Sequence, residues 1–244
     1  MEPPFKLQDF LKVFALSIGL FIGFATIFTF VPHATAVLAG FHPTVAFLVQ
    51  YLIQFLVLFF SLWVFVVDKY NLGLADFGFV KVRPWLLIKT VLLAYGFYWI
   101  VSIGLVTALE YTGLTLPGYE EQESYLEMFG YDALGLTSAF LIICVLAPFL
   151  EELFFRGFIY RTFTKTWPVW LASVLTASLF ALIHFQLQVF LPLFFLGLIL
   201  NYVYHRTGSV WSSVAFHSLN NTIAFSLDVY LYFHPEMIDV FMSR

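Results

Sequence analysis

The sequence is poor in charged residues and has a single cysteine. Asp, Glu, Lys and Arg together make up 11% of the residues, whereas 61% are hydrophobic. Soluble domains have roughly a quarter of their residues charged, so the composition excludes that class. The lone Cys144 excludes an internal disulfide. The 11 basic residues are scattered singly or in pairs, which argues against a nucleic-acid partner.

Long apolar runs dominate what is present. A helix of about 20 apolar residues crosses the ~30 Å hydrocarbon layer of a bilayer. The runs predict an all-α, polytopic transmembrane helical bundle, with residues 1–244 as a single membrane domain surrounded by lipid. About seven spans are expected, and eight are compatible with the pattern. The seven cover residues 12–31, 45–67, 85–108, 134–158, 168–186, 189–204 and 209–232.

The basic residues predict the orientation of the chain. If the N-terminus is inside, Lys6, Lys69 and Lys165 fall on the cytoplasmic side with nearly all other Lys and Arg, and only Arg244 falls on the other. The long loop 109–133 on that other side is acidic. The positive-inside rule therefore predicts a cytoplasmic N-terminus and a C-terminus on the opposite side of the membrane.

One predicted span contains an unusual cluster of charge. Glu151 and Glu152 are adjacent, and Arg156 follows Glu152 by four residues. Ionisable groups inside a membrane are costly, so they commonly mark functional sites and have partners. On a helix Glu152 and Arg156 share a face and can pair, whereas Glu151 points about 100° away. The alternative interpretation is a structural ion pair at the membrane boundary.

Two other predicted spans each carry a histidine in apolar surroundings. His184 ends the run FALIH in the fifth span, and His217 lies four residues before Asn221 in the seventh. The spacing places His217 and Asn221 on one helix face. We therefore expect these three residues to meet Glu151 in a polar pocket below the cytoplasmic surface.

The sixth predicted span has a polar pattern of its own. Gly197 and Asn201 lie four residues apart. A small residue lets two helices approach closely, and an amide side chain can bond across their interface. This pair predicts close packing with an interhelical hydrogen bond.

The polar residues form three motifs that resemble those of the CPBP family. That family contains the type II CAAX prenyl endopeptidases and the bacteriocin-processing and immunity (Abi) proteins. The motifs occur in the family's order, within a core over residues 134–232 in the C-terminal half. They are Glu151-Glu152-xxx-Arg156, Phe180-xxx-His184 and His217-xxx-Asn221.

The resemblance implies an intramembrane endopeptidase that acts on a peptide or protein, including lipid-modified ones. It implies that Glu151 activates water with help from His184, while His217 and Asn221 steady the oxyanion. The family's supporting glutamate and arginine map onto Glu152 and Arg156. The residue types suit peptide hydrolysis, which needs an activated water and donors for the oxyanion.

Zinc is the one cofactor that the candidate site residues could bind. Glu151, His184 and His217 with a water form a valid catalytic zinc set. However, the sequence has no HExxH motif, whose spacing would indicate zinc strongly. The same residues serve a metal-free glutamate mechanism equally well. We favour that mechanism with no cofactor, and zinc is the alternative.

Two non-protease interpretations also fit buried Glu, Arg and His residues. A non-catalytic immunity or scaffold protein could have inherited the site. A proton-coupled transporter could use the same groups as a proton relay. Transporters of that kind often have broken helices in two related halves, and the sequence shows no such symmetry. The endopeptidase is therefore the favoured function.

Overall fold

The structure is a computed structural model that describes residues 3–30, 43–113, 126–184 and 186–237. In this part of the chain all regular elements are helical. Four stretches are long and apolar enough to cross a membrane, namely Leu7–Thr26, Tyr51–Tyr70, Pro84–Leu109 and Ala133–Thr166. The predicted all-α membrane bundle is confirmed, and the chain is an integral membrane protein. Arg244 and residues 114–125 of the acidic loop 109–133 lie outside the described residues.

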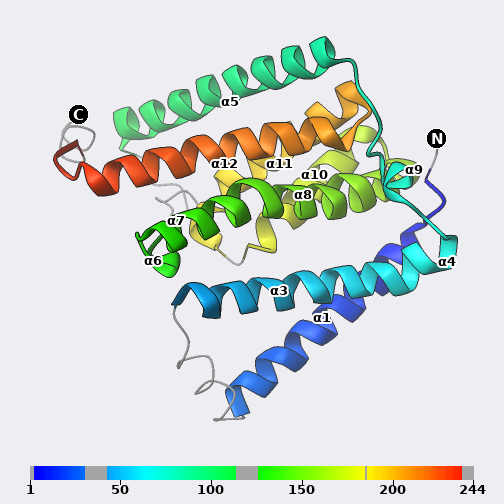
Figure 1. Ribbon diagram of the computed structural model, residues 1–244. Helices are drawn as coiled ribbons and strands as arrows, with labels where there is room; N and C mark the ends of the chain where they lie inside the picture. Colours follow the sequence, from blue (N-terminus) through cyan, green and yellow to red (C-terminus); the bar gives the residue numbers. More distant parts are fainter. Residues whose placement is uncertain (1–2, 31–42, 114–125, 185, 238–244) are drawn as a thin grey trace. The chain divides into compact units, whose positions relative to one another are not determined.

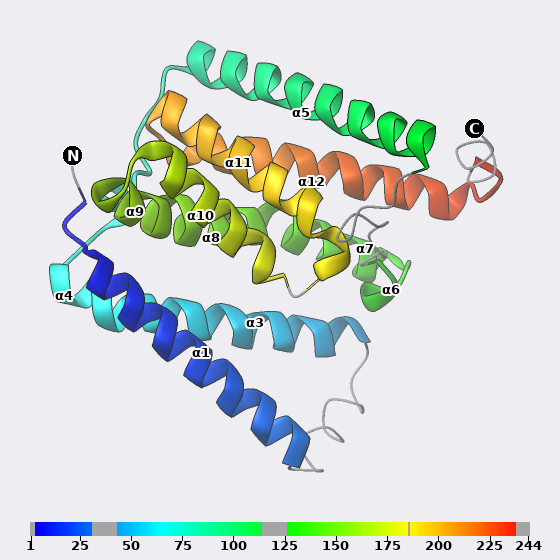
Figure 2. The same ribbon diagram turned by 180° about the vertical axis from the view of Figure 1, so that it is seen from behind.

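The helices are divided between two compact units. The first holds η2 (Leu74–Phe77), α5 (Pro84–Thr112), η4 (Leu153–Tyr160), α9 (Arg161–Thr166), α10 (Val169–Leu182), η5 (Leu187–Val189) and α11 (Phe190–Thr207), with α8 (Ala147–Glu152) from Pro148 and α12 (Val210–Phe233) as far as Asn220. The second holds α1 (Leu7–Phe30), α3 (Pro43–Leu62), η1 (Trp63–Val67), α4 (Asp68–Tyr70), α6 (Leu126–Phe129), α7 (Ala133–Ala139) and η3 (Phe140–Leu146), with the rest of α12. Figure 1 labels the helices, and Figure 2 shows them from behind.

The seven predicted spans all coincide with helices of the described residues, and these helices differ in length and in apolar character. Only four described helices have the length and composition of a span. α10 has 14 residues, which is about 21 Å at 1.5 Å per residue and shorter than the hydrocarbon layer. It ends at Leu182, although the prediction ran to 186. α11 and α12 are long enough, but polar residues such as Asn201 and His217 interrupt their apolar character.

In the first unit, α10 and α11 pack closely side by side (Figure 1). A Cβ atom added at Gly197 would lie 3.0 Å from the Cα and Cβ atoms of Ala177, which is closer than an ordinary van der Waals contact, so glycine favours this approach. Asn201 of α11 donates from Nδ2 to the Ser173 carbonyl of α10 at 3.0 Å. The predicted close packing and interhelical hydrogen bond are both confirmed.

The glutamate-bearing helix changes its winding next to the charged residues. α8 ends at Glu152, and the eight residues of η4 that follow are π-helical and all buried. π-helical turns are rare and are often found at functional sites, because they shift the side chains relative to a regular helix. Arg156 lies inside this segment.

In the second unit, α1 packs against α3, and a buried carboxylate ties the start of α1 to α4. Asp9 lies in the first turn of α1 and accepts from the Lys6 backbone N–H at 2.8 Å, which caps the helix start. It also accepts from Lys69 Nζ at 2.6 Å and from the Tyr70 hydroxyl at 2.9 Å. This capping explains why α1 begins at Leu7, five residues before the predicted span.

Candidate functional site

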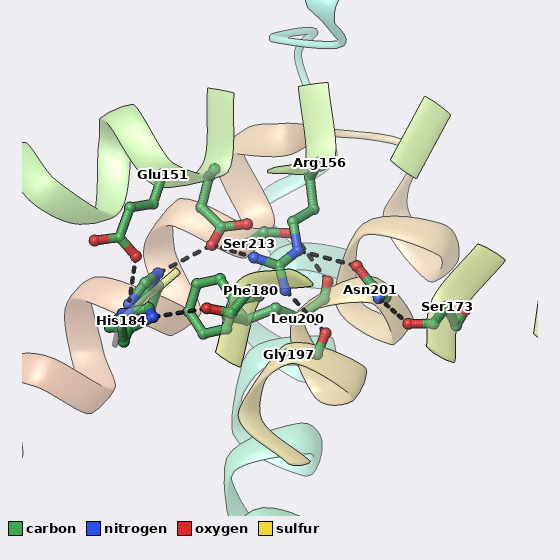
Figure 3. A network of polar contacts seen from close by, with 11 residues as sticks. Glu151, Arg156, Ser173, Phe180, His184, Gly197, Leu200, Asn201 and Ser213 are labelled. Atoms are coloured by element: carbon green, nitrogen blue, oxygen red, sulfur yellow. Dashed lines mark hydrogen bonds and ion pairs between the residues drawn. The ribbon is translucent and has the colours of Figure 1, made fainter. Parts of the chain in front are cut away.

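The centre of the candidate site is the guanidinium group of Arg156, which is fully buried. Its Nη1 donates to Glu152 Oε1 at 2.8 Å, as the four-residue spacing predicts. Its Nη2 donates to the Gly197 carbonyl at 2.9 Å, and its Nε donates to Asn201 Oδ1 at 3.1 Å. Figure 3 shows these contacts converging from α11 and the glutamate-bearing helix. Each of the three nitrogens therefore has an acceptor, which compensates for the buried charge.

His217 lies between the two glutamates. Its ring is buried, with Nδ1 2.9 Å from Glu152 Oε1 and Nε2 4.0 Å from Glu151 Oε2. The first distance is a hydrogen bond, and the second is too long for one. The sequence predicted that Glu151 and Glu152 face different neighbours, but both of them approach this one imidazole. Glu151 is the more accessible carboxylate, with 26% of its side chain exposed, whereas Glu152 is fully buried.

His184 lies elsewhere than predicted in two respects. It follows the end of α10 instead of lying within a helix, and it is half-buried instead of buried. Its Nδ1 is 2.7 Å from the Phe180 carbonyl. A carbonyl oxygen can only accept, so Nδ1 must carry the proton in this contact. In the neutral ring, Nε2 then has the lone pair.

Phe180 joins the histidines to the arginine. Its ring centre lies 5.0 Å from Arg156 Cζ, 4.9 Å from the His184 ring centre and 5.9 Å from that of His217. Both imidazoles meet the ring in an edge-to-face arrangement. The cation over the aromatic face adds electrostatic stabilisation at a desolvated position. The apolar residue of the second motif thus contacts Arg156 and both histidines.

Asn221 falls within the second unit, and the other motif residues fall within the first. Its Nδ2 donates to the Ile143 carbonyl of η3 at 2.9 Å, inside that second unit. The first unit brings Glu151, Glu152, Arg156 and His217 into one cluster, with His184 attached through Phe180. The grouping of Asn221 with this cluster stays a prediction.

Two carboxylate oxygens in the cluster are buried without a hydrogen-bond donor among the described residues, namely Oε2 of Glu151 and Oε2 of Glu152. Buried polar atoms without partners are rare in native proteins and cost about 1–3 kcal/mol each. Glu151 Oε2 lies 4.0 Å from His217 Nε2, so an acceptor without a donor beside an imidazole marks a place suited to a polar reactant such as water.

The described residues fit a zinc site only in part. Glu151 Oε2 and His217 Nε2 approach each other, but a catalytic zinc site usually takes three protein ligands. Across the described ranges, no three His, Cys, Asp or Glu side chains form a group arranged to hold a metal ion. The predicted set of Glu151, His184 and His217 is therefore not assembled as one ligand group.

Sequence reasoning missed two partners of Arg156. It treated Gly197 and Asn201 as packing residues, and the structure shows that they also bind the guanidinium. A signal was available, because a buried arginine needs several acceptors and Glu152 supplies only one side of it. The pair on the sixth span was the nearest set of unassigned polar groups in an apolar helix.

Comparison with known proteins finds a family model that matches the part of the chain containing the site. Residues 133–223 match the model of the type II CAAX prenyl endopeptidase Rce1-like family. This segment is similar to that family, and it contains all three motifs. The resemblance inferred from those motifs is thereby confirmed.

Similar proteins occur in two bacteria. An uncharacterized 24.3 kDa protein of Escherichia coli is 35% identical over 88 residues, which cover 34% of this chain and 41% of that protein. UPF0177 protein YbdJ of Lactococcus lactis is 29% identical over 118 residues, covering 43% and 50%. UPF0177 protein YbdI of the same organism is 35% identical over 82 residues, covering 32% and 42%. The chain thus spans half or less of the length of these relatives, and no solved structure matches it.

Proposed function

We propose that the protein is an intramembrane endopeptidase that hydrolyses a peptide bond with a water activated by Glu151. The observation that carries the proposal is the approach of Glu151 Oε2 to His217 Nε2 at 4.0 Å, inside the segment that matches the endopeptidase family. Glu151 is the partly accessible glutamate, and Glu152 is held by Arg156. Glu151 is therefore the carboxylate that a substrate can reach.

The distance between the two atoms suits a bridging water. A water about 2.8 Å from each of them makes two ordinary hydrogen bonds. Glu151 takes a proton from this water while the water oxygen attacks the carbonyl carbon of the scissile bond. When the tetrahedral intermediate collapses, the C–N bond breaks and Glu151 returns the proton to the departing amine. The products are a carboxylate and an amine, and no other reactant is consumed.

The remaining motif residues are proposed to serve the oxyanion and the water. The family resemblance assigns Asn221 to the oxyanion, and an amide N–H can donate there without a change of protonation state. It assigns His184 to the activation of water, for which Nε2 supplies a lone pair. Glu152 and Arg156 support the site through their ion pair.

The proposed substrate is a peptide or protein, and the family description points to a prenylated C-terminal tail. Purified protein in lipid vesicles is incubated with peptides that have and lack the prenyl group, and products are detected by mass spectrometry. Cleavage by the wild type and none by Glu151→Gln supports the endopeptidase. Equal results from both proteins favour a non-catalytic scaffold or immunity protein, and proton flux into the vesicles without cleavage favours a transporter.

The orientation is also a proposal, based on the one-sided distribution of Lys and Arg. Cysteines introduced into loop 109–133 should react with a membrane-impermeant thiol reagent added to intact cells. Cysteines introduced next to Lys165 should react only after the membrane is opened. The opposite labelling pattern would reverse the orientation and move the candidate site away from the cytoplasmic side.

A further inference from the structure

The start of α5 carries basic side chains that have no partner within the described part of the chain. Lys81, Arg83 and Lys89 are all exposed. None of the three forms a hydrogen bond or an ion pair with another described residue. The basic side chains that do donate to protein oxygens include Lys69, Arg156, Arg161 and Lys165. The three cations at α5 are therefore available to an anion from outside the protein.

The local backbone gathers these cations around one aromatic side chain. The chain just before α5 is not helical, and it is extended at Arg83, with φ −61° and ψ 126°. Residues two apart in an extended chain point to the same side, so Lys81 and Arg83 face outward together. Trp85 and Lys89 lie four residues apart on one face of α5. Helical side chains tilt toward the N-terminal end of their helix, which directs Lys89 toward Trp85 and Arg83. Trp85 is 73% exposed, and we call these four residues the α5 patch.

Hydrogen bonds to the start of α12 hold the adjoining segment in place. The Gly78 carbonyl accepts from the Val210 N–H at 2.9 Å, and the Val80 carbonyl accepts from the Ser209 hydroxyl at 2.6 Å. Arg206, three residues before Ser209, is a fourth exposed cation without a partner among the described residues. A segment that is already fixed loses little conformational entropy when it binds a ligand.

The α5 patch lies at the membrane surface. α5 is apolar from Pro84 to Leu109 and long enough to cross the bilayer, so the residues that precede it lie near the lipid headgroups. Lys89 lies five residues into α5, about 7.5 Å along the axis, and a lysine at that depth extends its charge back to the headgroups. An exposed tryptophan at this level is typical of membrane interfaces. Residues 71–90 contain one acidic residue, Asp76, against three basic ones, so the patch is positive.

We propose that the α5 patch is a binding site for the headgroup of an anionic phospholipid. Arg83 can donate two parallel hydrogen bonds to one phosphate group, and Lys81 and Lys89 add positive charge beside it. The exposed side chains of Trp85 and Ile88 border the acyl chains of such a lipid, whereas free phosphate or an acidic peptide has no acyl chain to cover them. The positive-inside rule accounts for the sign of these residues but not for their gathering around a tryptophan. The site is independent of the proposed endopeptidase activity.

The first test compares lipids that differ in headgroup charge. The purified protein in detergent is titrated with phosphatidylglycerol or with phosphatidylcholine, and bound lipid is counted by native mass spectrometry. We expect phosphatidylglycerol to bind at least about tenfold more tightly, because each basic residue near the membrane surface contributes about fivefold to the attraction. Equal binding of the two lipids would overturn the proposal.

Two competitors distinguish the lipid from other anions. Inorganic phosphate and a polyglutamate peptide, each in large excess, should leave the bound phosphatidylglycerol in place. Displacement by phosphate would assign the α5 patch to a free anion, and displacement by the peptide alone would assign it to an acidic protein partner. Either result would contradict the lipid site.

The second test removes the two cations that flank Trp85. Arg83→Gln/Lys89→Gln should weaken the binding of phosphatidylglycerol by about 25-fold, at about fivefold for each charge. The matched control is Lys6→Gln/Lys12→Gln, which removes two exposed lysines at the start of α1, a helix without tryptophan. The control should bind phosphatidylglycerol within about twofold of the wild type, because exposed charges farther than a Debye length are screened. An equal loss in the control would show that only the net charge matters, and the proposed site would be wrong.

Melting temperatures separate lipid binding from a structural role. Arg83→Gln/Lys89→Gln should melt like the wild type in phosphatidylcholine, since neither side chain has a partner among the described residues. Phosphatidylglycerol should raise the melting temperature of the wild type and of the control more than that of this variant, because a ligand of the folded state stabilises it. A variant that melts lower in both lipids with unchanged lipid affinity would refute the proposal. The wild-type comparison of the two lipids decides the point even if the variant does not fold.

Discussion

Among the described residues, each compact unit has an ion pair between a basic side chain and a buried carboxylate, and these two pairs have different surroundings. In the second unit, Asp9 pairs with Lys69 at 2.6 Å, and 40% of the lysine side chain is exposed. In the first unit, Glu152 pairs with Arg156 at 2.8 Å, and neither side chain is exposed. Water screens the first pair in part, whereas the second depends entirely on protein partners.

The two pairs differ in the hydrogen-bond donors that their carboxylate oxygens have. Both oxygens of Asp9 have donors, from Lys69 on one side and from Lys6 N–H and Tyr70 on the other. Glu152 crowds two donors onto Oε1 and leaves Oε2 without one among the described residues. The Asp9 pair therefore links the start of α1 to α4. The Glu152 pair instead contacts His217 and leaves one carboxylate oxygen without a donor among the described residues.

The largest effect is expected at Glu151, next to the second pair. Glu151→Gln is nearly isosteric but cannot take a proton, so cleavage should fall by at least about 10²-fold, the usual minimum contribution of a general base. The melting temperature in detergent should stay unchanged, because Glu151 is partly exposed and pairs with no arginine. Cleavage at the wild-type rate would remove the proposed base and the hydrolase with it.

A large loss of stability should follow from breaking the buried pair. Glu152→Gln leaves the Arg156 charge without its counterion, and we expect the free energy of unfolding to drop by about 3–5 kcal/mol. Activity should fall only in part, since Glu151 remains. Denaturant unfolding measures the stability, and the cleavage assay measures the rate.

The double variant Glu152→Gln/Arg156→Met is the control for Glu152→Gln. Removing both charges should recover part of the lost stability, because no uncompensated charge stays buried. A double variant that is less stable than Glu152→Gln alone would mean that the ion pair is not the source of the loss.

Substitutions in the Asp9–Lys69 pair of the second unit should have a smaller effect, which is confined to stability. Asp9→Asn removes the negative charge but can still accept hydrogen bonds, so we expect a loss of about 1–2 kcal/mol. Lys69→Ala should cost less than about 1 kcal/mol, because the lysine is largely solvated. Cleavage rates should match the wild type for both variants. A loss of activity in Asp9→Asn with normal stability would refute the contrast between the two pairs.

The smallest expected effect concerns metal. Treatment with a strong chelator should leave cleavage unchanged, and elemental analysis should find well below one metal ion per chain, because the proposed mechanism activates the water with side chains alone. Stoichiometric zinc, with activity restored only by its addition, would overturn this prediction and make Glu151 and His217 candidate ligands.

Parts of the candidate site could be predicted and parts could not, for physical reasons that differ by residue. The Glu152–Arg156 pair was predictable because residues four apart on a helix are neighbours whatever the rest of the chain does. The position of His184 was not. It depends on where α10 stops, and apolar residues continue past that point without a proline or glycine to mark the end.

The sequence by itself determined the class of protein, the helical secondary structure and the resemblance to the endopeptidase family, since hydropathy and motif spacing are properties of local segments. Only the tertiary structure decided that Arg156 reaches Gly197 and Asn201, and that His217 bonds Glu152. These partners lie 41, 45 and 65 residues apart in the chain. The rotation of each helix about its own axis selects which side chains meet, and that rotation is set by packing, as at Gly197 against Ala177, which no local pattern encodes.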